Sequence, residues 1–330
     1  MLDPGSLLIH IFGRSAAEAD VIRRGFHVTD PAHRDEIEHI GVTFLAGYNA
    51  ALREASAERL RRILEDRPPY DRPFAHEGAA MGFGVRAALH AGWCYNDFER
   101  RFIPALGDNY LYLYYVGLGW WFRLRYQHQP WAVMGAIARY DPRYRYLCLD
   151  GYGFMVGFYG GARLERARAL SRLPGYGVHA AMQGYGRSLW FLYRDDPDGR
   201  AAAIAAFPQP FQGDLWAGWG LAAAFTQIAQ PAEVFRLAEH VPVAYRPDYY
   251  QGAVFGWVAR RRADPDAFAR WCAGLDEAQR TGISSACDAC DVALMEAVAQ
   301  STSEDTIYAA WRIGTRTRAQ LLLAGQGILV

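Results

Sequence analysis

Four residues that can exchange a proton or form hydrogen bonds occupy one recurring place, directly before a glycine that returns about every 34 residues. A carboxyl group in an apolar pocket keeps its proton to higher pH, so an acid at this place could act as a general acid. If the glycine segments are copies of one helical unit, we expect the four side chains to point into one shared interior. They are Glu77, Asp150, Gln183 and Gln251.

Two more titratable residues belong to the same zone: His76 precedes Glu77, and Asp214 lies two positions before Trp216. The strongest candidate for the acid is Asp150, because it has the densest aromatic neighbourhood in the sequence. The sequence therefore gives four candidate catalytic residues, Asp150, Glu77, His76 and Asp214.

The same glycine segments are rich in tyrosine and tryptophan. Aromatic faces offer contact area to a long unsaturated ligand and can stabilise developing positive charge. An equally weighted alternative is that these rings only fill the core, while the acids cap helix N-termini. The candidate substrate-binding residues are Tyr152, Gln183, Tyr185, Trp190, Trp216, Trp219, Gln251 and Trp257.

Motifs for a metal or an organic cofactor are weak in this chain. Cys287 and Cys290 form a single C-x-x-C pair without a second pair, so packed helix cysteines are expected rather than zinc ligands. Asp288 and Asp291 lie three residues apart and could hold Mg²⁺ against a diphosphate, but a solvated helix face explains them more often. We expect no organic cofactor.

Composition excludes several classes of protein. The 330 residues carry 35 basic and 35 acidic side chains, and every basic one is arginine, so nothing favours nucleic acid as a partner. Without lysine there is no Schiff-base enzyme of the pyridoxal type and no Walker-type nucleotide hydrolase. No glycine loop that could cradle phosphate is present either, which predicts little affinity for nucleotides.

Several features suggest a protein of the cytoplasm. Five cysteines are too few and too unevenly paired for a secreted disulfide framework. Residues 1–10 lack the charged head and apolar core of a signal peptide. The most apolar stretch, Leu111 to Phe122, is shorter than the roughly 18 residues of a membrane span, so we expect a buried helix and no membrane span.

The elements that must position these residues are predicted to be helices. Prolines after a polar residue mark helix starts at Pro130, Pro197, Pro231 and Pro265, with Arg163 in the corresponding slot between them. Asp30 followed by proline predicts a long helix that ends near position 54.

Together, the proline and glycine series predict an all-α protein built from helix pairs with a period near 34 residues. It would be a helical-repeat domain over residues 30–315, either an α-solenoid or a closed α/α ring, with an N-terminal segment 1–29 and a tail 316–330. The period equals that of the tetratricopeptide repeat, although the consensus of that repeat is not kept.

Short motifs distributed along the chain resemble a bacterial family that is classed as a domain of unknown function and found in enediyne polyketide gene clusters. The resemblance implies a place in biosynthesis beside a polyene-making synthase, but no mechanism. It is carried by the segments at 23–26, 77–81, 149–154, 186–191, 214–218 and 251–253.

Three functions remain open on the sequence alone. The favoured one is cofactor-free, acid-initiated cyclisation or isomerisation of a hydrophobic polyene in natural-product biosynthesis. A second is isoprenoid (terpene) cyclisation in an aromatic cavity, and a third is a non-catalytic scaffold that sequesters a polyketide intermediate or docks partner biosynthetic enzymes.

Overall fold

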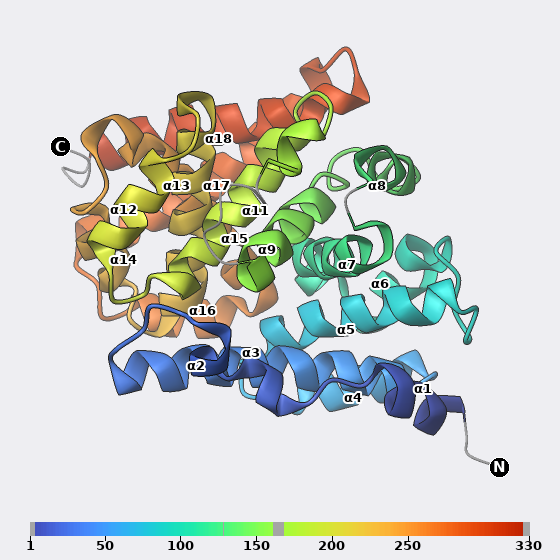
Figure 1. The fold of residues 1–330 in the computed structure, drawn as a ribbon. Coiled ribbons are helices and arrows are strands. Elements are labelled where there is room, and N and C mark those ends of the chain that lie inside the picture. The colour runs from blue at the N-terminus through green and yellow to red at the C-terminus, as the bar shows by residue number, and fades with distance from the viewer. Residues whose placement is uncertain (1–3, 128, 161–167, 326–330) are drawn as a thin grey trace.

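The computed structural model describes residues 4–127, 129–160 and 168–325, and every regular element in these ranges is a helix. The all-α prediction is confirmed for this part of the chain. The expected helix start at Arg163 lies outside the described residues. Figure 1 shows the helices packed into one body.

Seven long helices form the framework, and each one packs on the next along the chain. Shorter helices return the chain between them, so the long helices run side by side (Figure 1). The long helices are α3 (Pro31–Arg53), α5 (Arg72–Ala88), α7 (Leu111–Tyr126), α9 (Leu147–Gly160), α11 (Gly177–Leu192), α13 (Gln209–Thr226) and α15 (Arg246–Ala263). The shorter α-helices that follow them are α4 (Ala57–Glu65), α6 (Ile103–Leu106), α8 (Pro130–Ile137), α12 (Pro197–Ala205), α14 (Ala232–Ala238) and α16 (Pro265–Cys272).

Helix starts follow the sequence signals closely. The predicted helix from Asp30 is α3, whose first turn donates the Ala32 N–H to the Asp30 carboxylate at 2.8 Å. Asp196 and Asp264 cap α12 and α16 in the same way, so the starts expected at the prolines that follow them are confirmed. The predicted starts at Pro130 and Pro231 are also confirmed, by α8 and α14.

The recurring glycines let neighbouring long helices touch through their backbones. In α9, a Cβ on Gly151 would overlap the Val116 carbonyl oxygen of α7, and a Cβ on Gly153 would overlap the Ala181 carbonyl of α11. The first glycine thus faces the preceding long helix and the second faces the following one, a close approach that only glycine permits. The same arrangement recurs at Gly184 and Gly186 of α11 and at Gly218 and Gly220 of α13.

Residues at the start of α5, early in the row of long helices, contact α13 and α15 at its end. At this junction the Arg260 guanidinium of α15 donates to the carbonyl of Phe225 at 2.7 Å and to that of Tyr70, just before α5, also at 2.7 Å. The Tyr70 hydroxyl in turn donates to the Thr226 carbonyl at 2.9 Å, and Phe74 packs edge-on against Phe225. These contacts bring α5 against α13 and α15, so the long helices surround a central space.

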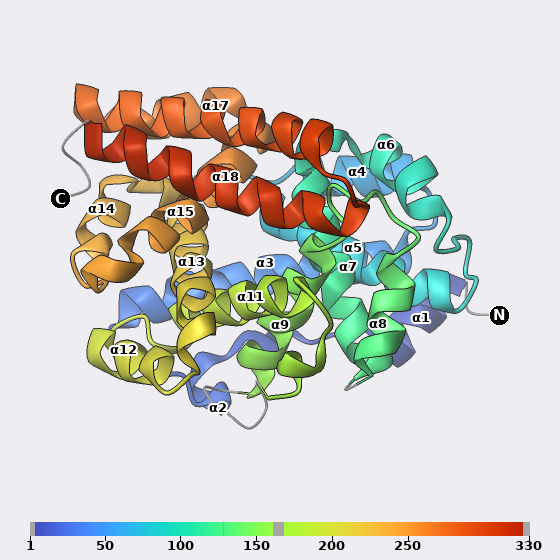
Figure 2. The same cartoon turned by 90° about the horizontal axis from the view of Figure 1, so that it is seen from above.

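Two long antiparallel helices, α17 (Glu277–Gln300) and α18 (Glu304–Gly325), lie together along one side and pack on α15 (Figure 2). Helix α18 continues through the boundary expected at residue 315. At the other end of the chain, α1 (Pro4–Phe12) and α2 (Val21–Arg24) pack along α3, and their side chains at Leu8 and Val21 are buried. Both terminal segments therefore contribute to the common core.

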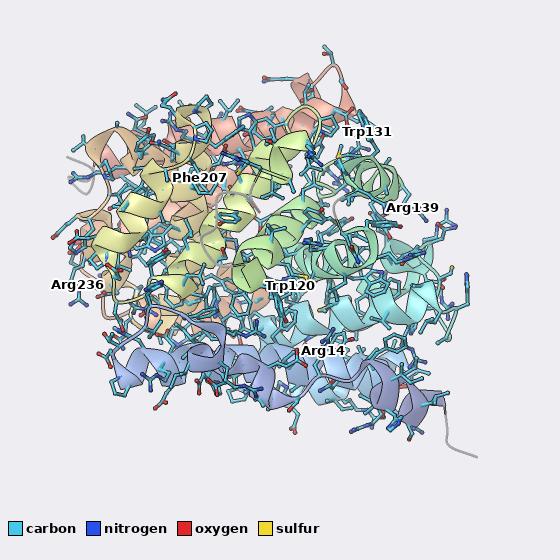
Figure 3. All side chains as sticks on the ribbon, in the orientation of Figure 1. Arg14, Trp120, Trp131, Arg139, Phe207 and Arg236 are labelled. Atoms are coloured by element: carbon cyan, nitrogen blue, oxygen red, sulfur yellow. The ribbon has the colours of Figure 1, made fainter. Side chains whose placement is uncertain are left out.

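Buried side chains pack between the long and short helices, and Figure 3 draws the side chains on the ribbon. Phe207, which follows α12, is buried there, whereas Trp131 at the start of α8 is 74% exposed. The apolar stretch from Leu111 is a helix, α7, and most of it is buried as expected. Within the described residues, no helix is both long and apolar enough to span a lipid bilayer.

Candidate active site

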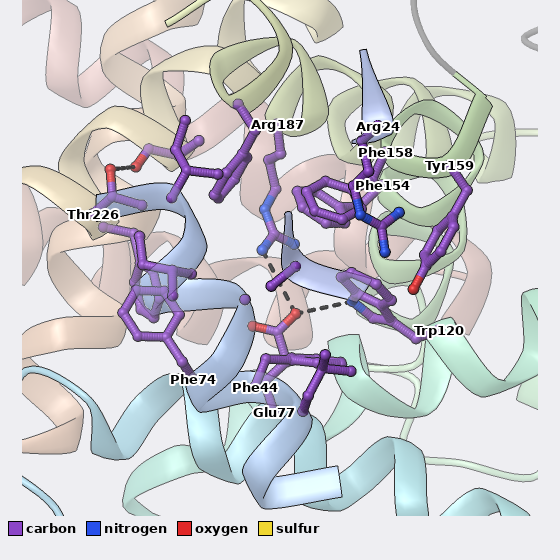
Figure 4. Close-up of a pocket in the computed structure, with 18 of the residues that line it drawn as sticks. Arg24, Phe44, Phe74, Glu77, Trp120, Phe154, Phe158, Tyr159, Arg187 and Thr226 are labelled. Carbon is purple, nitrogen blue, oxygen red and sulfur yellow. Dashed lines mark hydrogen bonds and ion pairs between the residues drawn. The ribbon is translucent and has the colours of Figure 1, made fainter. Parts of the chain in front are cut away.

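The central space holds a small cavity of about 60 Å³ between α3, α5, α7, α9, α11 and α13 (Figure 4). Its wall is mostly apolar, with Phe44 and Trp120 at a centroid distance of 4.5 Å and Trp120 and Phe154 at 4.9 Å. The other rings of the lining are Phe74, Phe158, Tyr159, Phe191 and Phe225. Aromatic faces thus surround any molecule that enters.

Two acids line this cavity: Glu18, which is half-buried and pairs with Arg14 at 3.4 Å, and Glu77, which is buried. Glu77 lies in the middle of α5, is 3% exposed, and its Oε1 accepts a hydrogen bond from the Trp120 indole N–H at 3.1 Å. Its nearest cation is Arg187, at 3.8 Å (Figure 4). Burial raises the pKa of Glu77, because the surroundings solvate the carboxylate poorly and this effect outweighs the attraction of Arg187.

Asp150 is held much more tightly than Glu77. Its carboxylate forms a short ion pair with Arg187 through Oδ1 and accepts the Gln183 amide N–H at Oδ2, at 2.9 Å. Although burial disfavours the charge of Arg187, Asp150 and Glu77 together raise its pKa. One guanidinium therefore serves two buried carboxylates and is closer to Asp150.

Arg187 also separates two cavities. A second cavity of about 40 Å³ lies on its other side, lined by Asp150 and by rings of α7, α15 and α18, including Tyr112, Phe255 and Trp311. Arg187, Leu221 and Phe225 line both spaces. The two cavities are therefore neighbours that share part of their walls.

The side of the first cavity nearest solvent is formed by the N-terminal segment. Arg24 of α2 lies over the rings of Phe158 and Tyr159, at 5.0 and 4.3 Å from their centroids (Figure 4). Tyr159 is 42% exposed, unlike the deeper rings. The expected segment 1–29 therefore supplies part of the cavity wall.

Three of the four residues before the glycines meet at this site, namely Glu77, Asp150 and Gln183. Gln251 is also buried, but its Oε1 accepts from Arg312 at 3.2 Å in a separate cluster. Asp214 belongs to that second cluster, where it pairs with Arg312 at 3.0 Å and with His179. Neither Gln251 nor Asp214 lines the two central cavities.

His76 points away from Glu77, because adjacent residues of a helix are about 100° apart. Its Nδ1 lies 2.9 Å from the Tyr114 hydroxyl, and its ring stacks on Tyr110 at 3.7 Å. Its Nε2 lies 3.3 Å from a Glu65 carboxylate oxygen. Burial lowers the pKa of His76, whose polar contacts fix α5 against its neighbours.

The aromatic residues expected to bind substrate lie elsewhere. Tyr152, Tyr185 and Trp219 follow the first glycine of their segments, so they are two residues, or about 200°, beyond the inward position and face the outer layer. Tyr185 packs on Phe207, for example, at 5.3 Å. None of Tyr152, Tyr185, Trp190, Trp216, Trp219 and Trp257 lines the two central cavities.

Sequence reasoning missed Arg187 and the rings that do line the cavity. A usable signal exists, because residues four positions apart share a helix face. Arg187 is four residues after Gln183, Phe154 is four after Asp150, and Trp120 is four after the residue that precedes Gly117. The inward face could thus have been traced by adding one helical turn to each repeated position.

The weak metal candidates do not enter the site. Asp288 and Asp291 both bind the Arg261 guanidinium, at 2.6 and 3.0 Å. Cys287 and Cys290 are buried free thiols, and across the described ranges no cluster of three metal-ligating side chains occurs.

Chemically, the site combines a carboxyl group that can donate a proton with walls made mainly of aromatic rings. A carboxyl group whose pKa is raised can give a proton to a bound double bond. The face of Trp120 can stabilise the positive charge that results, whereas the Phe154 ring already has the Arg187 guanidinium over it at 4.9 Å. Asp150 and Arg187 neutralise each other's charge in an ion pair beside Glu77.

Residues 5–319 match a family described as "Protein of unknown function (DUF1702)", so the chain belongs to this family. No curated protein and no solved structure gives a significant match.

Proposed function

We propose that the protein catalyses acid-initiated isomerisation or cyclisation of a hydrophobic polyene in its central cavity, without an organic cofactor. The observation that carries this proposal is Glu77, a buried acid of raised pKa in an aromatic wall, hydrogen-bonded by an indole N–H. Glu77 rather than Asp150 is the proposed acid, because the Asp150 carboxylate is already engaged by Arg187 and Gln183.

The proposed step begins when Glu77 transfers its proton to one carbon of a double bond. The π electrons form the new C–H bond, and the adjacent carbon becomes a cation facing Trp120. Isomerisation ends when the Glu77 carboxylate removes a proton from a neighbouring carbon, which restores the acid and leaves a shifted double bond. In cyclisation, a second double bond of the chain attacks the cation before that proton is lost.

A polyene requires more room than either cavity offers alone. Cavities of about 60 and 40 Å³ are smaller than the approximately 150 Å³ that holds benzene. We therefore propose that the ligand occupies both cavities and displaces the Arg187 side chain, which keeps its ion pair with Asp150. Entry would be past Arg24 and Tyr159.

Fluorescence titration with a linear conjugated heptaene tests ligand binding. Saturable quenching is expected, and Trp120→Phe should remove much of it because this ring lines the cavity. The matched control is Trp131→Phe, whose ring is exposed on α8 and should leave the quenching curve unchanged. Equal curves for both variants would show that the chain binds elsewhere.

A non-catalytic scaffold that sequesters a polyketide intermediate is the alternative proposal. It predicts saturable heptaene binding, protection of the polyene from oxidation, and no product. For an isoprenoid cyclase of the Mg²⁺-diphosphate type the site offers less support, because Asp288 and Asp291 are bound to Arg261.

The wider setting is proposed from the sequence. The motifs that resemble an enediyne-cluster family favour a polyketide-type polyene and partner biosynthetic enzymes, while the sparse cysteines and the N-terminal residues favour a cytoplasmic location. We also propose that the long helices are copies of one repeat of about 34 residues that closes into an α/α ring. This idea is supported by the recurring glycine contacts and by the junction at Arg260.

A further inference from the structure

A polar groove of about 610 Å³ lies at the N-terminal end of α3, beside the start of α12. Among its lining residues are Asp30, His33, Arg194, Asp195 and Arg200. The groove and the first central cavity share no lining residue, so a ligand of the groove is independent of the proposed function.

Two arginines of this groove differ from the other buried arginines. Of the seven that are buried among the described residues, five donate hydrogen bonds to carboxylates, a side-chain amide or backbone carbonyls: Arg86, Arg145, Arg187, Arg260 and Arg312. The remaining two, Arg194 and Arg200, donate none within the described part of the chain, and both line the groove.

Arg200 is the more extreme case. It is 1% exposed, and neither its Nε nor its Nη2 has a hydrogen-bond partner among the described residues. Its guanidinium is stacked on the Trp219 ring at 3.8 Å, which fixes its plane. Burial, together with the nearby charge of Arg194, lowers the pKa of Arg200 to about 10. An unpaired buried charge of this kind is costly unless a ligand neutralises it.

Arg194 is held in a similar way. It is 8% exposed, lies over the Trp190 ring at 5.0 Å, and has its nearest carboxylate, Glu36, at 3.9 Å. Two guanidinium planes, each fixed by a tryptophan, thus lie near one another with their donors unused.

The carboxylates of the groove do not supply the missing partner. Asp195 accepts the backbone N–H groups of Thr29 and Asp30, at 2.9 and 2.8 Å, and also contacts His33. Asp30 caps α3 through the Ala32 N–H. Neither forms an ion pair with Arg200. The carboxylates of Asp30 and Asp195 therefore bind groups at the start of α3. The guanidinium N–H groups of the two arginines remain available to bind another anion.

We propose that this groove binds a phosphoryl group between Arg194 and Arg200. Two guanidinium groups offer several N–H donors in fixed planes, an arrangement that suits the tetrahedral oxygens of a phosphate dianion. The N-terminus of the nine-residue helix α12, which begins at Pro197 in the groove wall, adds a favourable dipole. The phosphoryl group could come from free phosphate or from a phosphomonoester.

Calorimetric titration of the full chain with inorganic phosphate tests this proposal at constant ionic strength. We expect saturable binding that weakens at least tenfold in Arg200→Met. The matched control is Arg59→Met on α4, an exposed arginine away from the groove, which should bind phosphate like the unaltered protein. The same titration is carried out with glycerol phosphate and with acetate in place of inorganic phosphate. Tighter binding of glycerol phosphate identifies a phosphomonoester as the ligand, and equal binding identifies free phosphate.

Thermal unfolding supplies a second readout that a merely structural arginine would not give. Without phosphate, Arg200→Met should unfold at the same temperature as the unaltered protein or a higher one, because an unpaired buried charge has been removed. Phosphate should stabilise the unaltered protein and not the variant. Lack of saturable phosphate binding, equal binding of acetate, or undiminished binding in Arg200→Met would overturn the proposal.

Discussion

Replacing the two buried carboxylates of the central site one at a time should change the stability of the fold by very different amounts. In Asp150→Asn the new amide keeps the shape and can still accept from Arg187. Gln183 can turn its own amide to preserve the second hydrogen bond, because its Oε1 has no partner among the described residues. The charge that balances Arg187, which is 7% exposed, is lost.

The magnitude depends on how well the remaining carboxylate can compensate. Removing one partner of a buried ion pair costs about 3–5 kcal/mol. Glu77, at 3.8 Å from Arg187, would supply part of the missing charge, so we expect about 3 kcal/mol, the lower end of this range. For a chain of 330 residues the loss corresponds to a fall of roughly 4 °C in unfolding temperature.

Glu77→Gln should change stability by no more than about 1 kcal/mol at neutral pH, since it removes an acid whose ionised form is poorly solvated. The Trp120 N–H can still donate to the amide oxygen. Urea and thermal unfolding followed by circular dichroism would compare the two variants. If Glu77→Gln were as destabilising as Asp150→Asn, or more so, the division into a structural and a functional carboxylate would be refuted.

Three further predictions concern packing, pH and access. Gly184→Ala should destabilise the protein by about 3 kcal/mol or prevent folding, because the new Cβ would lie 2.6 Å from the Asp150 carbonyl carbon. The control Gly135→Ala has open space around the new Cβ and should fold normally. Urea unfolding would compare the two variants. The pKa of Glu77 in the folded protein lies above its ordinary 4.5, so its ionisation does not destabilise the fold below about pH 4.5 and destabilises it increasingly as pH rises toward the folded pKa. The stability of Glu77→Gln relative to the unaltered protein should therefore increase over that range. A stability difference that does not depend on pH would contradict the raised pKa. Arg24→Ala should speed heptaene association in stopped-flow quenching by uncovering Phe158, and an unchanged rate would place the entrance elsewhere.

Much of the helical framework was predictable because its signals are local. A capping Asp with proline at the first helical position depends only on neighbouring backbone atoms, and Asp30, Asp196 and Asp264 all cap as expected. The glycine series was equally informative, since a helix without side chains on one stripe must meet another backbone there.

The functional face was only partly predictable, because it depends on which side of each helix turns inward. The inward positions of Glu77, Asp150 and Gln183 were expected. Part of the predicted aromatic set, namely Tyr152, Tyr185 and Trp219, was placed one residue beyond the glycine, which is the outward side of the helix. The clustering of Arg187 with both acids depends on long-range packing between α5, α9 and α11, and pairs 37 residues apart or more leave no spacing signal. Sequence reasoning also could not rank the acids, because the difference between Asp150 and Glu77 lies in their partners.

Solvent deuterium incorporation would test the central proposal most directly. A linear conjugated heptaene is incubated with the protein in D₂O, and the recovered hydrocarbon is analysed by mass spectrometry and NMR. If Glu77 protonates the polyene, each isomerised or cyclised molecule should carry deuterium at the carbon that was protonated, and Glu77→Gln should slow its formation by about 10² or more. Product that carries no deuterium, or that forms equally fast in Glu77→Gln, would contradict catalysis by this acid.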